Sequence, residues 1–484
     1  MSYKHGIYGS ELATSLVPMT EISAGLPVVF GTAPVHLASS PAAANIPILC
    51  YTYSEAVAAF GYSDDWENYT LCEFMKSHFS LFNMCPVVLI NVLDPANTAH
   101  VTAKTVTLTV SNGTASINDA VILSSLKVQV NQAGQPLTIN TDYTAAYDSN
   151  NNVVITPLTG GVIASATSIY VSYNKLDASK VMATDIVGGI DTTTGKREGL
   201  ELVNEIYPRF GLVPGILLAP GWTDKPAVAA VLMAKTENIN GCFEAIALLD
   251  ISTTDCTKYS DVSTWKNTKN YISPYAAACW PKVSLSSVVY HLSTQIAGVL
   301  CKTDSNNDDV PYVSPSNQSL QCDSAVDDSG NEIYLDNSQA AYLNSQGIVT
   351  ALNFIGGWRA WGNRTTAYPS DTDVKDSFIP IRRMFNWVNN ELITSFWSKI
   401  DNAINKRLIN TIVDSANIWL NGLTAKGYIL GGKVEFRSDE NTTTNLMDGV
   451  IYFHVYITPP SPARDIEFVQ EYDTDYLANL FDES

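Results

Sequence analysis

The stretch from Gly189 to Arg197 comes nearest to a catalytic motif, because two glycines frame a turn that ends in Lys196 and Arg197. A phosphate-binding loop has four residues between its glycines, and a Ser or Thr after the lysine holds magnesium. Here five residues separate Gly189 from Gly195, and an arginine follows the lysine. The stretch therefore predicts a surface turn and not a nucleotide site.

The remaining polar residues lack the spacings that acid–base, nucleophilic or metal chemistry needs. The six histidines are scattered, without an H-x-x-x-H pair, and no G-x-S-x-G elbow is present. Acidic runs at 304–309 and 323–332 do not follow the 12-residue calcium loop, and Asp371 and Asp373 are most simply explained as a polar loop. We expect no enzyme, no metal site and no cofactor.

The eight cysteines include no C-x-x-C pair, which argues against zinc. Five of them lie in apolar stretches, where a free thiol packs like a small hydrophobic group, and we expect these in the core: Cys50, Cys72, Cys85, Cys242 and Cys279.

The composition indicates a large, acidic, self-associating protein. A chain of 484 residues predicts two to four domains, and only 16% of its residues are charged, so much surface is expected to be covered by partners. The net charge of −20 opposes binding to a phosphate backbone, so nucleic acid is not an expected partner. No apolar run approaches the roughly 18 residues that span a bilayer, and the start lacks a secretory pattern, so we expect synthesis in the cytosol without membrane insertion.

The hydrophobic patterns that predict secondary structure divide the chain into three regions. Apolar strands at 26–31 and 86–92 are separated by helical segments, and the same alternation of strand and helix patterns begins again at about residue 184. This pattern predicts an α/β layer. Between 97 and 183 the apolar residues alternate with period two and turn formers separate the runs, which predicts an inserted all-β domain resembling a sandwich.

The third region combines two amphipathic helices with alternating strands. Apolar residues from Ile381 to Phe396 fall on one helical face, and those from Leu408 to Trp419 fall on another. Val450 to Ile457 alternate cleanly, and Ile466 and Phe468 lie on one face of an expected final strand. Residues 1–20 form a mostly polar lead that predicts one strand on an extended arm.

The sequence contains a series of short stretches that resemble, in the same order, those of contractile tail sheath proteins of phages and phage-like particles. The matching stretches are His5–Tyr8, Gly31–Pro34, Tyr69–Phe74, Gly347–Phe354, Gly357–Thr365, Ile381–Phe385, Trp419–Leu423, Gly431–Gly432, Asn441, Gly449, Tyr452–Pro460 and Pro462–Phe468. The resemblance spans nearly the whole chain except about 97–183, where members of this family vary.

The resemblance implies a multidomain α+β and α/β fold with strand-exchanging terminal arms. We divide the chain into an N-terminal arm (1–20), an α/β domain (21–96 and 184–355), the inserted β domain (97–183), a C-terminal sheath domain (356–463) and a C-terminal arm (464–484). Strand exchange between neighbours is β-augmentation repeated through a lattice. The apolar residues expected to anchor the exchanged strands are Ile7, Tyr8, Leu12, Ile466 and Phe468.

The function that the resemblance implies is structural. Hexameric rings would stack in a helix around a tail tube, and contraction from a metastable extended state would drive the tube through the target envelope. The implied partners are further copies of this chain, the tube protein, and baseplate and tail terminator proteins, in a tail assembled in the host bacterial cytoplasm.

A tube contact is expected from the C-terminal domain, and the basic candidates in this acidic chain are Arg382, Arg383, Lys399, Lys406 and Arg407. Because Arg382 and Arg383 follow Pro380 at a helix start, where cations are unfavourable, something acidic should compensate them. That partner is either the tube or an acid of the same subunit such as Asp376.

Two other functions compete with the sheath. A tail-tube or capsid subunit would share the acidity, the β content and the self-association. An α/β enzyme is supported only by the strand and helix rhythm of residues 184–300, and such rhythm does not establish chemistry.

Overall fold

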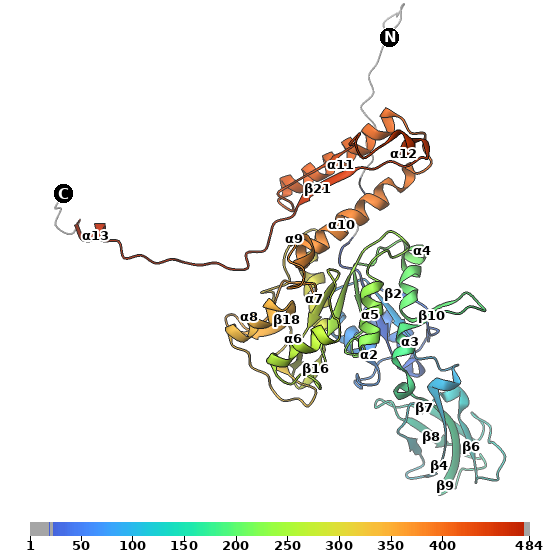
Figure 1. Ribbon diagram of the computed structural model, residues 1–484. Helices are drawn as coiled ribbons and strands as arrows, with labels where there is room; N and C mark the ends of the chain where they lie inside the picture. The colour runs from blue at the N-terminus through green and yellow to red at the C-terminus, as the bar shows by residue number, and fades with distance from the viewer. Residues whose placement is uncertain (1–18, 20–22, 479–484) are drawn as a thin grey trace, which may run out of the picture.

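The computed structural model describes residues 19 and 23–478, and its centre is an eight-stranded mixed sheet (Figure 1). The strand order is β19-β18-β14-β13-β12-β1-β3-β2, and all neighbours are parallel except the outermost pair at each edge. The strands are β1 (Pro27–Gly31), β2 (Ile48–Cys50), β3 (Val87–Asn91), β12 (Ile216–Leu218), β13 (Ile246–Asp250), β14 (Ala276–Cys279), β18 (Ile348–Asn353) and β19 (Trp358–Trp361).

The central strands are continuous apolar runs because both of their faces are covered. Every residue of β1, β3, β12, β13 and β14 is buried, which is the pattern of a parallel sheet between helical layers. The helices of this region are α1 (Tyr53–Phe60), α2 (Thr70–Met75), α3 (Ala183–Val187), α4 (Ile206–Phe210), α5 (Pro226–Ala234), α6 (Tyr259–Thr268), α7 (Leu292–Ser305) and α8 (Asn337–Ser345). A π-helical segment, Lys76–Leu81, continues α2.

Two short antiparallel sheets accompany this α/β body. Strands β10 (Gly189–Ile190) and β11 (Arg197–Glu198) form a hairpin, and β15 (Lys282–Leu285) lies between β16 (Val288–Tyr290) and β17 (Ser324–Val326).

Between Val101 and Leu176 the chain forms two three-stranded antiparallel sheets around one apolar core of their own. The strands are β4 (Val101–Thr109), β5 (Ala115–Ile117), β6 (Lys127–Gln129), β7 (Tyr143–Tyr147), β8 (Val153–Pro157) and β9 (Ser168–Leu176). Val101 pairs with Leu176, so the chain enters and leaves this region at one place. The region lies at one end of the molecule, away from helices α10 and α11 (Figure 1).

The C-terminal region is built from two long helices and a β-hairpin. Its elements are α9 (Val374–Ser377), α10 (Ile379–Phe396), α11 (Lys406–Lys426), β20 (Gly431–Glu435), α12 (Thr443–Met447), β21 (His454–Thr458) and α13 (Asp475–Ala478). The Asn405 side chain caps α11, and Gly427 ends it with φ of 80°. Met384, Trp387, Leu420 and Val434 share a core between both helices and β20.

The structure moves one expected boundary and shortens one expected strand. Residue 356 lies inside the β18–β19 hairpin, and since β19 belongs to the central sheet, the C-terminal region begins after Trp361. Strand β21 begins at His454 and not at Val450, because the Asn441 side chain bonds both backbone groups of Tyr452.

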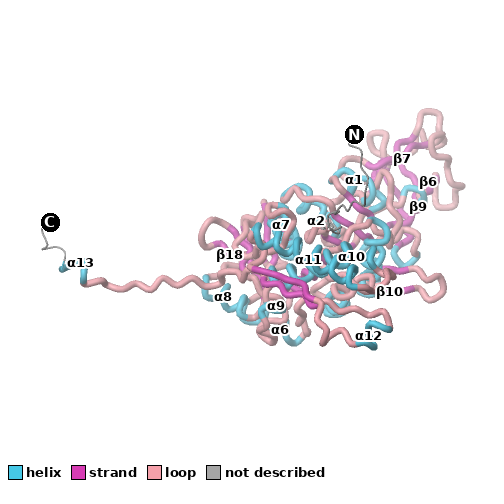
Figure 2. The backbone as a smooth tube through the Cα atoms, turned by 90° about the horizontal axis from the view of Figure 1, so that it is seen from above, coloured by secondary structure: helices cyan, strands magenta, loops and turns pink. Residues whose placement is uncertain are grey.

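Residues 459–473 extend away from the body without forming a strand (Figures 1 and 2). The expected strand at Ile466 and Phe468 is therefore absent from the isolated subunit, because no neighbouring strand lies beside it.

Candidate assembly site in the C-terminal region

The two outer edges of the β20–β21 hairpin differ in whether their backbone groups have hydrogen-bond partners. The Asn417 side chain, on α11, accepts a hydrogen bond from the Val434 amide (2.7 Å) and donates one to the Val434 carbonyl (3.0 Å). Both backbone groups of Val434 therefore point away from β21, and the middle of the outer edge of β20 is capped.

The outer edge of β21 is the open one. Val434 pairs with Val455, so the alternation of an antiparallel ladder directs the backbone groups of Val455 and Ile457 outward. Among the described residues, none bonds to these outward groups. An exposed edge of this kind is a template for a further strand.

The segment that follows β21 is extended and exposed. Pro459, Pro460 and Pro462 cannot donate to a ladder or continue a helix, so the chain leaves the hairpin without regular structure. Ile466 and Phe468 are 69% and 85% exposed, and Val469 and Tyr472 are equally uncovered. These apolar side chains do not cover the core of their own subunit.

The start of the chain is less fully described. Ile7, Tyr8 and Leu12 lie outside the described residues, so their placement as strand anchors stays a prediction. The Ala24 carbonyl, close to the first described residues, accepts a hydrogen bond from Arg383 (3.2 Å). The root of the N-terminal segment is thus attached to helix α10.

Arg382 and Arg383 are buried, which corrects their expected role as tube contacts. Arg383 binds both oxygens of Asp304 on α7, and Arg382 binds Asp376 (Nη1 to Oδ1, 3.0 Å). The residues are only 6% and 3% exposed. The compensating acids therefore belong to the same subunit, as in the alternative that named Asp376.

The Arg383–Asp304 pair joins the C-terminal region to the α/β body. Burial raises the pKa of Asp304 above its ordinary value, although the charge of Arg383 opposes this effect. In this buried ion pair, the guanidinium of Arg383 stabilises the charged form of the Asp304 carboxylate.

The other three basic candidates are at or near the turn between α10 and α11. Lys406 and Arg407 are exposed and Lys399 is half-buried, and no ion pair involves any of them within the described part of the chain. Trp397 (63% exposed) and Ile400 (58% exposed) lie beside them. This surface is cationic and apolar, and it is accessible.

Sequence reasoning missed Asn417, Trp397 and Ile400. The sequence pattern does not reveal the role of Asn417. A polar residue on an amphipathic helix is expected to face solvent, and its contact with β20 is known only from the tertiary structure. The apolar pair Trp397 and Ile400 was detectable, since both fall where the helical periodicity ends.

The stretches that suggested chemistry have structural roles. Residues 189–198 form the β10–β11 hairpin, whose turn is closed by the Asp191 side chain. Asp373 caps α9, and Asp327 accepts hydrogen bonds from its own loop. Cys85 is exposed, contrary to expectation, because it lies in the loop before β3.

Within residues 19 and 23–478, no cluster of His, Cys, Asp or Glu has a geometry that would hold a metal ion. In the same described part, no helix is both long enough and apolar enough to span a bilayer.

Comparison with known sequences connects this architecture with tail sheaths. No family model matches the chain. The tail sheath protein of Burkholderia phage BcepMu is 26% identical over 491 residues, which cover 99% of this chain and 98% of that protein. The tail sheath protein of Escherichia phage P2 is 23% identical over 75% of this chain and 87% of its own length. The chain belongs to the contractile tail sheath proteins.

Solved structures carry the same fold. A chain of the extracellular contractile injection system PVC, in a contracted sheath complex, has a TM-score of 0.58 at 13% identity and covers 98% of this chain and 99% of its own. A chain of the anti-feeding prophage baseplate has a TM-score of 0.57 at 16% identity, covering 98% and 100%.

Because its sequence relatives are structural tail proteins, this sheath protein is a structural subunit of a contractile sheath and not an enzyme. It assembles into an oligomeric part of a virion tail or a phage-like particle.

Proposed function

We propose that this sheath subunit polymerises as hexameric rings, stacked helically around a tail tube, and contracts from a metastable extended state to drive the tube through the target cell envelope. The observation that carries the proposal is the open outer edge of β21 next to an exposed apolar arm in the same chain. One subunit thus offers both an acceptor edge and a donor strand. Contraction repacks subunits without a nucleotide, as a transition between two packings.

The exchanged strand joins the edge of β21. An arm carrying Ile466 and Phe468 forms backbone hydrogen bonds with Val455 and Ile457, each worth about 1 kcal/mol net. The outer edge of β20 is unsuited to this role because the Asn417 side chain already bonds to both backbone groups of Val434. An N-terminal arm carrying Ile7, Tyr8 and Leu12 supplies a second strand from another neighbour. Repeated through a closed lattice, such links keep subunits connected while globular faces slide.

The tube binds at the turn between α10 and α11. Lys399, Lys406 and Arg407 form the cationic part of this surface, and Trp397 and Ile400 supply the apolar part. In a chain of net charge −20, an accessible cationic surface favours an acidic partner. Baseplate and tail terminator proteins bind the two ends of the sheath, and assembly takes place in the host bacterial cytoplasm.

The domain organisation that we propose keeps the terminal arms (1–20 and 464–484) and the inserted domain (97–183), and its C-terminal domain begins after Trp361. The separate apolar core between Val101 and Leu176 supports an independent inserted domain. We place it on the outer surface of the sheath.

Removing the C-terminal arm tests the proposed exchange. Deletion of residues 464–484 is expected to leave a folded subunit with unchanged circular dichroism that no longer builds cylinders in negative-stain electron microscopy. A milder variant, Ile466→Ser with Phe468→Ser, should lower assembly, whereas Tyr334→Ser, at an equally exposed position outside the arm, should not. Regular contractile cylinders from the truncated protein would refute the exchange.

A charge reversal tests the tube surface. Lys399→Glu with Lys406→Glu and Arg407→Glu should abolish co-sedimentation with tube protein while sheath cylinders still form. The control is Lys426→Glu, an exposed reversal at the other end of α11. Unchanged tube binding by the triple variant would exclude this surface.

A further inference from the structure

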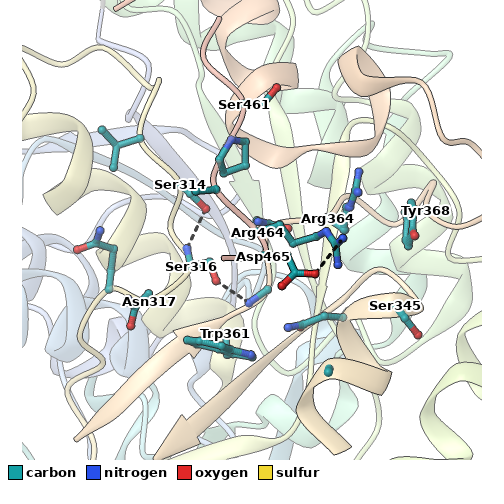
Figure 3. A pocket seen from close by; sticks show the side chains of 18 of the residues that line it. Ser314, Ser316, Asn317, Ser345, Trp361, Arg364, Tyr368, Ser461, Arg464 and Asp465 are labelled. Atoms are coloured by element: carbon teal, nitrogen blue, oxygen red, sulfur yellow. Dashed lines mark hydrogen bonds and ion pairs between the residues drawn. The ribbon is translucent and has the colours of Figure 1, made fainter. Parts of the chain in front are cut away.

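A cavity of about 710 Å³ lies at the root of the C-terminal arm. Its walls come from residues 312–318 and 337–345 of the body, from residues 361–368 at the junction of the body with the C-terminal region, and from residues 460–465 of the arm root. Figure 3 shows Arg364, Arg464 and Asp465 in the middle of this cavity, with Trp361 and Tyr368 in its walls. The cavity is therefore formed partly by the folded subunit and partly by the root of its arm.

The cavity is cationic in a strongly acidic protein. Arg364 and Arg464 line it together, and Asp465 is the only acid among the described residues of the lining. Burial lowers the pKa of the Arg364 guanidinium, and the nearby charge of Arg464 lowers it further. Arg464 is 61% exposed, and its only ion pair within the described residues is with Asp465, at 3.9 Å. Two like charges in one cavity favour an anionic ligand.

The aromatic groups of the cavity add a second requirement. The Arg364 guanidinium lies over the rings of Tyr368 (4.3 Å) and Phe378 (3.6 Å), and Trp361 forms part of the floor. Serine and asparagine side chains fill much of the remaining lining. A ligand that carries both carboxylates and aromatic rings would match this surface best.

The end of the C-terminal arm has this chemistry. No Lys or Arg follows Arg464, whereas seven acids do: Asp465, Glu467, Glu471, Asp473, Asp475, Asp482 and Glu483. Tyr472 and Tyr476, each 75% exposed, are interspersed among them. The arm leads away from the folded body (Figure 1). An extended chain advances about 3.3 Å per residue, which puts Glu471 roughly 20 Å beyond Asp465.

We propose that this cavity binds the acidic, tyrosine-bearing segment Glu471–Tyr476 from the C-terminal arm of a second copy of the chain. The proposal rests on the arm exchange proposed above and adds a second anchor point beyond the strand. Carboxylates of the segment pair with Arg464 and Arg364, and its tyrosine rings pack on Trp361 and Tyr368.

The anchor couples successive links of the lattice. Arg464 and Asp465 belong to the arm root of the receiving subunit, so an occupant that binds Arg464 also fixes the direction in which the receiving arm leaves. A bound arm thus orients the next arm.

Photo-crosslinking tests the contact directly. Benzoylphenylalanine replaces Tyr476, the assembled sheath is irradiated, and crosslinked peptides are identified by mass spectrometry. We expect intermolecular crosslinks to residues 312–318 and 361–368. The same probe at Tyr334, which is 71% exposed outside the arm, should give none there. Assembled sheaths with crosslinks only elsewhere, or without crosslinks, overturn the inference, whereas failure of the unmodified chain to assemble overturns the proposed function.

Charge reversal tests the electrostatic part. Arg464→Glu should raise the concentration needed for assembly by roughly fivefold, as loss and inversion of an exposed charge pair imply. Combining it with Glu471→Lys should restore assembly. The control Lys426→Glu has similar exposure and should have no effect. An Arg464→Glu protein that assembles like the control contradicts the inference.

Discussion

A buried ion pair between Glu73 and His291 joins helix α2 to the start of α7. The Glu73 carboxylate accepts hydrogen bonds from the His291 backbone amide and pairs with its ring Nδ1, both at 2.7 Å. Burial lowers the pKa of His291, but the charges of Glu73 and Asp250 outweigh burial and raise it above its ordinary value of 6.5. Burial raises the pKa of Glu73, but His291 outweighs this effect and holds it below 4.5.

Glu73→Gln should therefore destabilise the subunit in a pH-dependent way. The contribution of His291 is complete below pH 6.5 and is lost as the pH rises through its raised pKa, while that of Glu73 is present above pH 4.5. We expect a loss of about 1.5 to 3 kcal/mol near pH 5.5 and a smaller loss at pH 9, measured by urea unfolding. Glu67→Gln, at an exposed position, is the control. An equal loss at both pH values would argue against the ion pair.

The Arg383–Asp304 pair makes a second prediction at this scale. Arg383→Met leaves Asp304 buried without its guanidinium, so the free energy of unfolding should fall by about 3 to 5 kcal/mol. Arg383→Met with Asp304→Leu should recover much of this loss, because no buried charge remains. Urea denaturation followed by tryptophan fluorescence measures both. Equal losses in the single and double variants would mean that the lost stability comes from packing and not from the unpaired buried charge.

At the scale of elements, the hairpin β20–β21 is a sheet with one capped and one open edge. Helix α11 supplies the cap through Asn417, and the same helix contributes Leu420 to the core beneath the hairpin. One helix thus supports the sheet and caps one of its edges, which leaves the outer edge of β21 open to a further strand. This arrangement limits the ways in which neighbouring subunits can pair.

Val455→Pro should block assembly without unfolding the subunit. The amide of Val455 points away from β20, so proline removes a docking donor and no hydrogen bond within the hairpin. Val455→Ala loses comparable apolar contacts but keeps the amide, which makes it the matched control. Negative-stain microscopy should show cylinders for the alanine variant and none for the proline variant. Cylinders from both would exclude β21 as the docking edge.

At the scale of the whole molecule, the body, the inserted region and the C-terminal region have separate apolar cores. The inserted region and the helices α10 and α11 lie at opposite ends of the body (Figure 1). Contacts that hold the lattice can therefore change while the inserted region stays folded. The C-terminal arm extends well beyond the globular body (Figures 1 and 2).

Replacing residues 102–175 by a two-residue glycine turn should preserve assembly. Val101 and Leu176 already pair, so a short turn can close the gap, and Leu176 stays in the core of the body. We expect cylinders of smaller outer diameter in electron microscopy, with circular dichroism reporting a folded body. A folded deletion variant that fails to polymerise would place a lattice contact in the inserted region.

The sequence by itself determined the features that depend on local pattern. Buried strands such as β3 and β13 have continuous apolar runs, α10 and α11 have helical periodicity, and the region from Val101 to Leu176 alternates with period two. These patterns are readable because each side chain's environment repeats along its own element. The ordered landmarks of the C-terminal half were also sufficient to indicate the family.

The tertiary structure alone decided which polar groups are buried and which edges are open. Arg382 and Lys406 look alike in sequence, yet one is buried against Asp376 and the other is exposed. Asn417 acquires its role only when β20 lies beside α11, and β19 joins the central sheet only through its pairing with β18. Each outcome depends on a partner distant in the chain, and hydrogen bonds and ion pairs across such distances leave no periodic trace in the sequence.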